Sequence, residues 1–145
     1  MKQAIFSKKG AKVVGPYSPA IKFGNLLFIS GQIGKNPKTD KLGNDIKEQT
    51  EWIFKNILSI LEIEGLTLDD VLKTNVYLAN MNDYQVMNEI YAKHFKEPFP
   101  ARATVAVAKL PAGALVEIEV LAGLKGSSEN EDCCGGGCGG DCEDC

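Results

Sequence analysis

One arginine within a run of small apolar residues is the feature of this sequence with the clearest chemical meaning. Arg102 lies near the start of the run 100–111, where four alanines leave space around it. Its guanidinium is always protonated and offers a planar fork that matches a carboxylate through two hydrogen bonds. Glu117, on a strand that returns after a Pro/Gly turn, is expected to reach the same end of the ladder and to supply a base. A cationic group that binds the substrate anion, next to a carboxylate that acts as a base, is the minimum set of groups for hydrolysing a small organic acid.

A second glutamate, Glu119, lies on the same strand as Glu117. Side chains alternate between the two faces of a strand, so both carboxylates are expected on one face and the apolar residues between them on the other. A carboxylate in a mostly apolar strand costs free energy unless it is paired or functional. Two structural alternatives stay open: Arg102 pairs with one of these glutamates across a hairpin, or both carboxylates lie on a solvated face.

Four further residues are candidates for a ligand site. Tyr17 lies in a turn that two prolines hold rigid, so its ring either lines a pocket or packs against the protein. Ser30 and Gly31 end a predicted buried strand, where the hydroxyl and the free N–H either contact a ligand or close the turn. Asn88 lies on a predicted helix, where solvent exposure is the simpler expectation.

Hydrophobic periodicity predicts the elements that position these residues. Apolar runs predict five strands, over residues 3–7, 25–30, 71–78 and the two halves of 100–120. One helix is expected to begin at Asp45, with Glu48 completing a capping-box pattern, and to end at Gly65. A second helix is expected over Tyr84–Phe95, with Asp83 as its N-cap.

The resulting order of elements is β, β, α, β, α, β, β, which indicates an α+β fold. Two helices of this length can cover only one face of such a sheet. The strands are too apolar for the other face to lie in water, so we expect self-association through that face.

Composition narrows the class of protein further. The chain has 145 residues, 44% of them hydrophobic and 24% charged, which fits one globular domain. Residues 126–145 contain six acids and no Lys or Arg. The net charge is therefore −3 for the whole chain but about +3 for residues 1–125. No dense Lys/Arg block indicates nucleic acid as a partner. No apolar run is long enough for a bilayer and no secretory signal is visible, so we expect a cytoplasmic protein.

The segment 126–145 is expected to be a disordered acidic Cys/Gly-rich tail, because it has too few apolar residues to offset its ordering entropy. It holds all five cysteines, Cys133, Cys134, Cys138, Cys142 and Cys145. Only Cys142 and Cys145 have the CxxC spacing of zinc sites, and soft-metal binding or thiol exchange stays open. The body has one histidine, His94, which excludes a multi-histidine metal site in one subunit. Near a helix C-terminus, it is expected to interact favourably with the helix dipole.

Several short motifs occur together in one order along the chain. They are Gly15-Pro16-Tyr17-Ser18, Phe28-Ile29-Ser30-Gly31-Gln32-Ile33, Asn36-Pro37-Lys38-Thr39, Lys73-Thr74-Asn75-Val76-Tyr77, Asn82-Asp83-Tyr84 with Asn88 and Tyr91, and Phe99-Pro100-Ala101-Arg102 through to Glu119. Over roughly residues 1–124 the sequence resembles the RidA/YjgF family of enamine/imine deaminases. The tail is not part of that pattern, so the expected domains are 1–125 and 126–145.

The resemblance implies a chorismate-mutase-like subunit and a homotrimer with active sites in the clefts between subunits. It also implies hydrolysis of 2-aminoacrylate and related imines, such as 2-iminobutanoate and 2-iminopropanoate, to 2-keto acids and ammonia. Arg102 would bind the substrate carboxylate and Glu117 would orient or activate water. Tyr17, Ser30, Gly31 and Asn88 would line the pocket.

The chemistry agrees with that implication, because an imine carbon is already electrophilic and requires no metal or other cofactor. Beside Arg102, the pKa of Glu117 is expected to be lowered, which would keep the carboxylate ionised and ready to accept a proton. Two alternatives remain: an endoribonuclease or translation inhibitor, as some relatives are described, and a non-catalytic protein that binds 2-keto acids.

Overall fold

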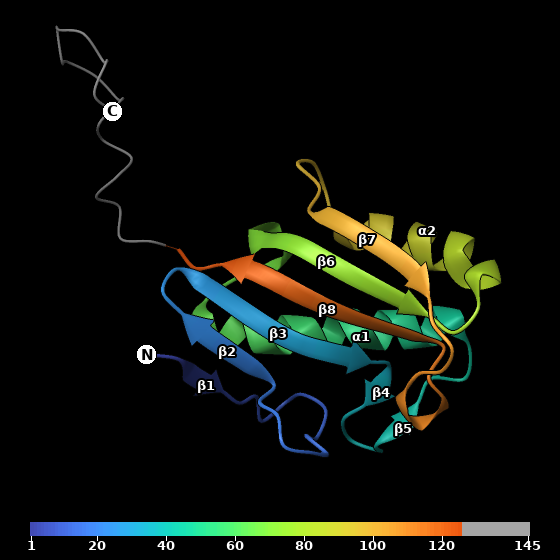
Figure 1. The fold of residues 1–145 in the computed structure, drawn as a ribbon, viewed down its shortest axis with the longest axis horizontal. Coiled ribbons are helices and arrows are strands. Elements are labelled where there is room, and N and C mark those ends of the chain that lie inside the picture. Colours follow the sequence, from blue (N-terminus) through green and yellow to red (C-terminus); the bar gives the residue numbers. More distant parts are fainter. Residues whose placement is uncertain (126–145) are drawn as a thin grey trace, which may run out of the picture.

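The computed structural model describes residues 1–125, so the predicted tail and all five cysteines lie outside the described residues. A six-stranded mixed sheet has two helices, α1 (Ile46–Leu61) and α2 (Tyr84–His94), on one of its faces (Figure 1). The strands lie in the spatial order β1 (Gln3–Ile5), β2 (Ala20–Phe23), β3 (Leu26–Ile33), β8 (Val116–Gly123), β6 (Val71–Leu78) and β7 (Ala101–Ala106). Among the strands of residues 1–125, only β6 and β7 pair in parallel. The predicted α+β class is confirmed.

The core lies between the helices and one face of the sheet. Strand β8 shows the expected alternation, because Val116, Ile118 and Val120 are buried while Glu117 and Glu119 are on the other face. The helix-free face, called here the open face, exposes 45% of Phe28 on β3. Self-association through this face stays a prediction.

Helix α1 begins and ends close to where the sequence predicts. Asp45 Oδ1 accepts the Glu48 N–H at 2.8 Å, while Glu48 Oε2 accepts from the N–H of Asn44 rather than from that of Asp45. A short 3-10 turn, Glu62–Glu64, follows the helix, and Gly65 ends it with a φ of 69°. This left-handed conformation favours glycine.

The start of α2 differs from the prediction that Asp83 caps it, because Asp83 makes no side-chain capping bond. Asn80 Oδ1 instead accepts the Asn82 N–H at 2.9 Å and begins a 3-10 turn, Met81–Asp83, that continues into the helix. Met87, Ile90 and Tyr91 of α2 are buried at helical spacing, and so is Phe95 directly after the helix.

His94 does more than lie near the C-terminus of α2. Its Nε2 is 2.9 Å from Glu51 Oε2 of α1, and its ring stacks on Phe54 with centroids 4.4 Å apart. The one histidine of the chain therefore joins the two helices.

The sequence-based prediction missed one strand and gave a wrong end to another. Strand β2 was not predicted; it forms a hairpin with β3 through Gly24, whose φ is 58°. Strand β3 does not end at Gly31. It continues to Ile33 through a register irregularity between Ile29 and Gln32, which places Ser30 and Gly31 within the strand.

The predicted hairpin between the Arg102 and Glu117 strands is also wrong. Strand β8 pairs with β3 and β6, so β6 lies between β7 and β8. The 3-10 turn Pro111–Gly113 is part of a crossover past β6, so the alternative in which Arg102 pairs with Glu117 or Glu119 across a hairpin is wrong.

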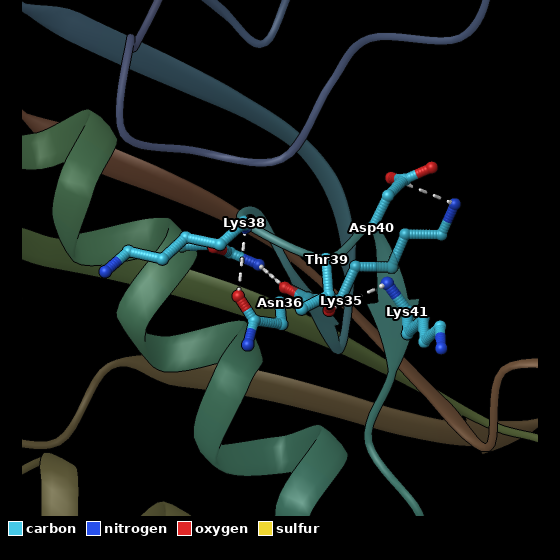
Figure 2. A network of polar contacts seen from close by, with 7 residues as sticks. Lys35, Asn36, Lys38, Thr39, Asp40 and Lys41 are labelled. Atoms are coloured by element: carbon cyan, nitrogen blue, oxygen red, sulfur yellow. Dashed lines mark hydrogen bonds and ion pairs between the residues drawn. The ribbon is translucent and has the colours of Figure 1, made fainter.

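A small two-stranded ribbon follows β3, formed by β4 (Lys35–Asn36) and β5 (Lys41–Leu42). Figure 2 shows its polar network, in which Asn36 Oδ1 accepts the Lys38 N–H at 2.9 Å and Lys35 Nζ lies 3.6 Å from Asp40 Oδ1. Asn56 of α1 donates to the Lys35 carbonyl at 2.9 Å. The ribbon is thereby attached to α1, just beyond the end of β3.

No helix within residues 1–125 is both long enough and apolar enough to cross a bilayer.

The junction between β3 and β4 gives a stability prediction. A Cβ at Gly34 would overlap the backbone of Gln49 in α1, which cannot move without displacing the helix. We expect Gly34→Ala to lower the free energy of unfolding by about 2 kcal/mol or more, measured in urea. Gly123→Ala is the matched control, because its Cβ would lie 3.5 Å from Leu72 in ordinary contact. Equal stabilities for the two variants would contradict this packing argument.

Candidate functional site

The six predicted site residues divide between two cavities. Tyr17, Ser30, Gly31 and Glu117 line a cavity of about 660 Å³, called here the glutamate cavity. Asn88 and Arg102 line a second cavity of about 320 Å³, called here the arginine pocket, together with Tyr91, Ala92, Phe99 and Pro100.

Strand β7 and helix α2 hold Arg102 in the arginine pocket. Arg102 Nη1 donates to Asn88 Oδ1 at 2.7 Å, and Nη2 donates to the Tyr84 hydroxyl at 2.9 Å. The guanidinium carbon lies 4.7 Å from the ring centroid of Tyr91 and 5.7 Å from that of Tyr84. Cation–π attraction and two hydrogen bonds therefore orient the fork.

These contacts leave Arg102 able to bind an anion. A guanidinium has five N–H donors, and the two bonds within residues 1–125 use one on each terminal nitrogen. Tyr91 is itself fixed by a hydroxyl contact of 2.9 Å with Thr74 on β6, and burial raises the pKa of its phenol. The Tyr91 phenol therefore remains neutral beside the guanidinium, and the positive charge of Arg102 is free to attract a carboxylate.

The irregularity in β3 shapes the glutamate cavity. Ser30 donates its hydroxyl to the Ser18 carbonyl at 2.6 Å and its N–H to the Pro19 carbonyl at 2.9 Å, which fixes the proline turn against the strand. The Ser30 hydroxyl thus closes the turn, one of its two predicted roles, while the turn presents Tyr17 to the cavity.

Gly31 gives Glu117 the space that its carboxyl group occupies. A Cβ at Gly31 would lie 2.5 Å from Glu117 Oε1 and 2.9 Å from its carboxyl carbon. Any other residue would push the carboxyl group away, so the close approach of the Glu117 side chain explains glycine here.

The electrostatics of Glu117 are opposite to the sequence-based expectation. Burial, followed by the negative charge of Glu119, raises the pKa of the Glu117 carboxyl group above its ordinary value. The expected lowering by Arg102 does not occur in this subunit. Glu117 is therefore a carboxyl group that holds a proton more strongly than a solvated glutamate does.

Arg102 and Glu117 do not meet within one subunit. Arg102 is in register with Thr74, whose hydroxyl contacts Tyr91 on the helix-covered side. Glu117 is in register with Tyr77, three residues further along β6, on the open face. The expected proximity at one end of the ladder is wrong, because β6 separates the two strands and the side chains leave opposite faces.

Sequence reasoning placed Asn88 in the site but did not assign a site role to Tyr84 or Tyr91. Their spacing on α2 was the available signal, because residues i, i+4 and i+7 lie along one side of a helix. This stripe faces the edge strand β7, where Arg102 lies.

Comparisons with known proteins agree with this architecture. The sequence profile of the endoribonuclease L-PSP family matches residues 8–124. A RutC family protein of Pyrococcus horikoshii is 51% identical over 123 residues, covering 84% of this chain and 98% of that protein. The 2-iminobutanoate/2-iminopropanoate deaminase of Homo sapiens is 40% identical over 123 residues, covering 84% of this chain and 90% of that one. The crystal structure of RidA from an Antarctic Psychrobacter bacterium superposes with a TM-score of 0.82 at 45% identity, covering 84% and 99% of the two chains.

The raised pKa of Glu117 gives a second stability prediction. Because the folded protein favours the protonated carboxyl group, its contribution to stability is present at low pH and is lost as the pH rises through the raised pKa. We expect Glu117→Gln to raise the Tm at about pH 7 by roughly 1–3 °C, and the gain to disappear near pH 4. Thermal unfolding followed by circular dichroism across this range measures the effect.

The matched control for this prediction is Glu64→Gln. Glu64 accepts a hydrogen bond from Lys22 Nζ at 3.1 Å, so removal of its charge should not stabilise the protein. A Glu117→Gln gain that is the same at both pH values would show that desolvation of the charge is not its cause.

Proposed function

Since the chain belongs to the endoribonuclease L-PSP family, we propose that it hydrolyses imines of the 2-iminopropanoate and 2-iminobutanoate type to 2-keto acids and ammonia. Relatives from Dermatophagoides farinae and Homo sapiens are named 2-iminobutanoate/2-iminopropanoate deaminase, and one from Arabidopsis thaliana is named reactive intermediate deaminase A. The observation that carries the proposal is the fork of Arg102, fixed by Asn88 and Tyr84 with N–H donors remaining.

The proposed reaction begins with binding of the substrate carboxylate by Arg102. Two parallel N–H···O bonds would fix the plane of the carboxylate and hence the direction of the adjacent C=N carbon. Orientation of this kind lowers the barrier by removing the freedom of the reactants before the reaction.

Glu117 would then transfer the protons. As a carboxylate it takes a proton from water while the water oxygen bonds to the carbon of the protonated imine, which gives a neutral carbinolamine. Glu117 then returns this proton to the amine, the C–N bond breaks with its electron pair going to nitrogen, and the departing ammonia takes up the hydroxyl proton as the keto group forms. General acid–base catalysis of this kind is most effective when the pKa of the group is near the working pH.

Two subunits would complete one site. Arg102 and Glu117 use opposite faces of a sheet within a subunit, so a substrate that touches both requires the arginine pocket of one copy beside the glutamate cavity of another. The open face offers apolar contact area for this assembly, with Val105 of β7 48% exposed and Phe28 of β3 45% exposed. We propose a homotrimer with three sites of this kind, in line with the resemblance.

The name of the family suggests a second candidate, an endoribonuclease. Enzymes that cleave RNA by proton transfer commonly use histidine. The one histidine of this chain, His94, contacts Glu51 and stacks on Phe54 between α1 and α2, away from both cavities. The third candidate, a protein that binds 2-keto acids without turnover, uses the same arginine. Both are outcomes of the experiment below.

Arg102→Ala is expected to abolish hydrolysis of 2-iminopropanoate, a loss of at least about 100-fold in kcat/KM, because the carboxylate loses its orienting bonds. The imine is generated in the assay by an amino-acid oxidase, and its uncatalysed decay is subtracted. Arg102→Lys is the control, since it retains the charge but not the fork, and it should keep only part of the activity.

Normal turnover by folded Arg102→Ala would contradict the proposal. Binding of 2-keto acid by the unaltered protein without hydrolysis of fresh imine would indicate the binding protein instead. Ribonuclease activity that survives purification and the Arg102 substitution would indicate the nuclease.

The two-subunit site predicts complementation between inactive variants. We expect Arg102→Ala and Glu117→Gln chains, each inactive alone, to regain about a quarter of the unaltered activity when unfolded together and refolded at equal amounts. This fraction follows because a working site needs the arginine from one variant and the glutamate from the other. No recovery in mixed trimers, verified by mass spectrometry, would show that each site belongs to one chain.

A further inference from the structure

Glu119 is a carboxylate that the proposed reaction does not use, yet the sheet holds it firmly. Its Oε1 accepts a hydrogen bond from Asn75 Nδ2 at 2.8 Å and another from the Tyr77 hydroxyl at 2.7 Å. Both donors lie on β6, on the open face. An ionised carboxylate is an acceptor only, so two donors on one oxygen suit the charged form.

The position of Glu119 relative to Glu117 is fixed by the backbone. The two residues are two positions apart on β8, so their Cα atoms are about 7 Å apart and their side chains share a face. Tyr77 is the partner of Glu117 in the strand register and the hydrogen-bond donor to Glu119. One residue of β6 therefore contacts both members of the carboxylate pair.

Tyr77 remains a donor throughout the working pH range. Its hydrogen bond to Glu119, and to a smaller extent burial and the charges of both glutamates, raises the pKa of its phenol. The hydroxyl proton therefore stays on Tyr77 and keeps the Glu119 carboxylate in place.

We propose that Glu119 is a positioning residue of the deaminase: fixed by Asn75 and Tyr77, its charge lets Glu117 keep the proton that it takes from water and return it to the departing amine. This inference rests on the proposed function. In this role Glu119 acts on Glu117 through its charge and does not contact the substrate.

The proton balance shows why this task matters. Water gives one proton to the Glu117 carboxylate as its oxygen bonds to the carbon of the protonated imine. The same proton then passes to the amine of the carbinolamine, the C–N bond breaks toward nitrogen, and the hydroxyl proton is taken up by ammonia, which leaves as ammonium. A solvated carboxyl group would release the proton to bulk water first. Burial and the fixed charge of Glu119 raise the pKa of Glu117 and oppose that release.

Few other titratable groups face Glu117 in the described chain. Strand β3 offers none beside it, since Gly31 and Ile33 are its neighbours there. The remaining titratable side chains that line the glutamate cavity are Lys12, Tyr17 and Lys35. Lys35 Nζ lies 3.6 Å from Asp40 on the β4–β5 turn, which partly neutralises it. Glu119 is thus the acidic neighbour of Glu117 along the strand.

Glu119→Gln tests the inference, because glutamine keeps the shape and an acceptor oxygen for Asn75 and Tyr77 but loses the charge. The Glu117 carboxyl carbon is titrated by 13C NMR and assigned by its absence in Glu117→Gln. Its midpoint is expected to move down by about 0.5–1 pH unit in Glu119→Gln. The acidic limb of kcat/KM for 2-iminopropanoate should move down by the same amount, with kcat reduced a few-fold.

Two variants complete the experiment. Glu64→Gln removes a carboxylate that is paired with Lys22, away from the cavity. It should leave unchanged both the 13C midpoint of Glu117 and the midpoint of the acidic limb of kcat/KM. Tyr77→Phe keeps both carboxylates but removes one donor to Glu119, so it should shift the midpoints in the same direction by less. It also serves as the test if Glu119→Gln does not assemble.

The outcomes separate this inference from the proposed function. An unchanged 13C midpoint in folded Glu119→Gln, or in Tyr77→Phe if the former does not assemble, overturns the inference even if the protein is an active deaminase. A shifted midpoint with an unshifted acidic limb overturns it too, since the coupling then has no part in the reaction. A protein with no hydrolysis of imine overturns the proposed function, and the role of Glu119 in it, whatever the NMR titration shows.

Discussion

The two-residue alternation of β8 is the constraint on which the rest of the structure depends. Its apolar residues pack beneath the helices, with Val116 and Ile118 fully buried, and its two glutamates necessarily leave the opposite face. A shift of one residue in register would bury both carboxylates and expose the core. Stability of the core therefore fixes the direction in which Glu117 and Glu119 point, and no separate device is needed to place them on the open face.

Features that depend on local physics could be predicted from the sequence. Residues 71–78 form β6 with the expected bounds, and Asp45 and Gly65 mark the ends of the first helical region as expected. The faces of β8 followed from alternation alone. Such features are determined within a few residues by side-chain period, capping and the conformational freedom of glycine, so one sequence is sufficient to recognise them.

Features that depend on distant pairing could not be predicted in this way. Insertion of β6 between β7 and β8 separates Arg102 from Glu117, although the two runs are adjacent in sequence and joined by a turn. The predicted lowering of the Glu117 pKa was wrong for the same reason, because the prediction assumed that Arg102 lies beside Glu117. Strand β2 is only four residues long and exists through its pairing with β3. In each case the missing information was which strands lie side by side.

The desolvated carboxyl group of Glu117 makes the two halves of the proposed site unequal in free energy. Because its charge is unfavourable in the fold, a neutral substitution at this position relieves a cost, whereas Arg102 gains from Asn88, Tyr84 and Tyr91 whether or not substrate binds. The fold thus holds the cation through contacts that favour it and keeps the acid against a desolvation cost.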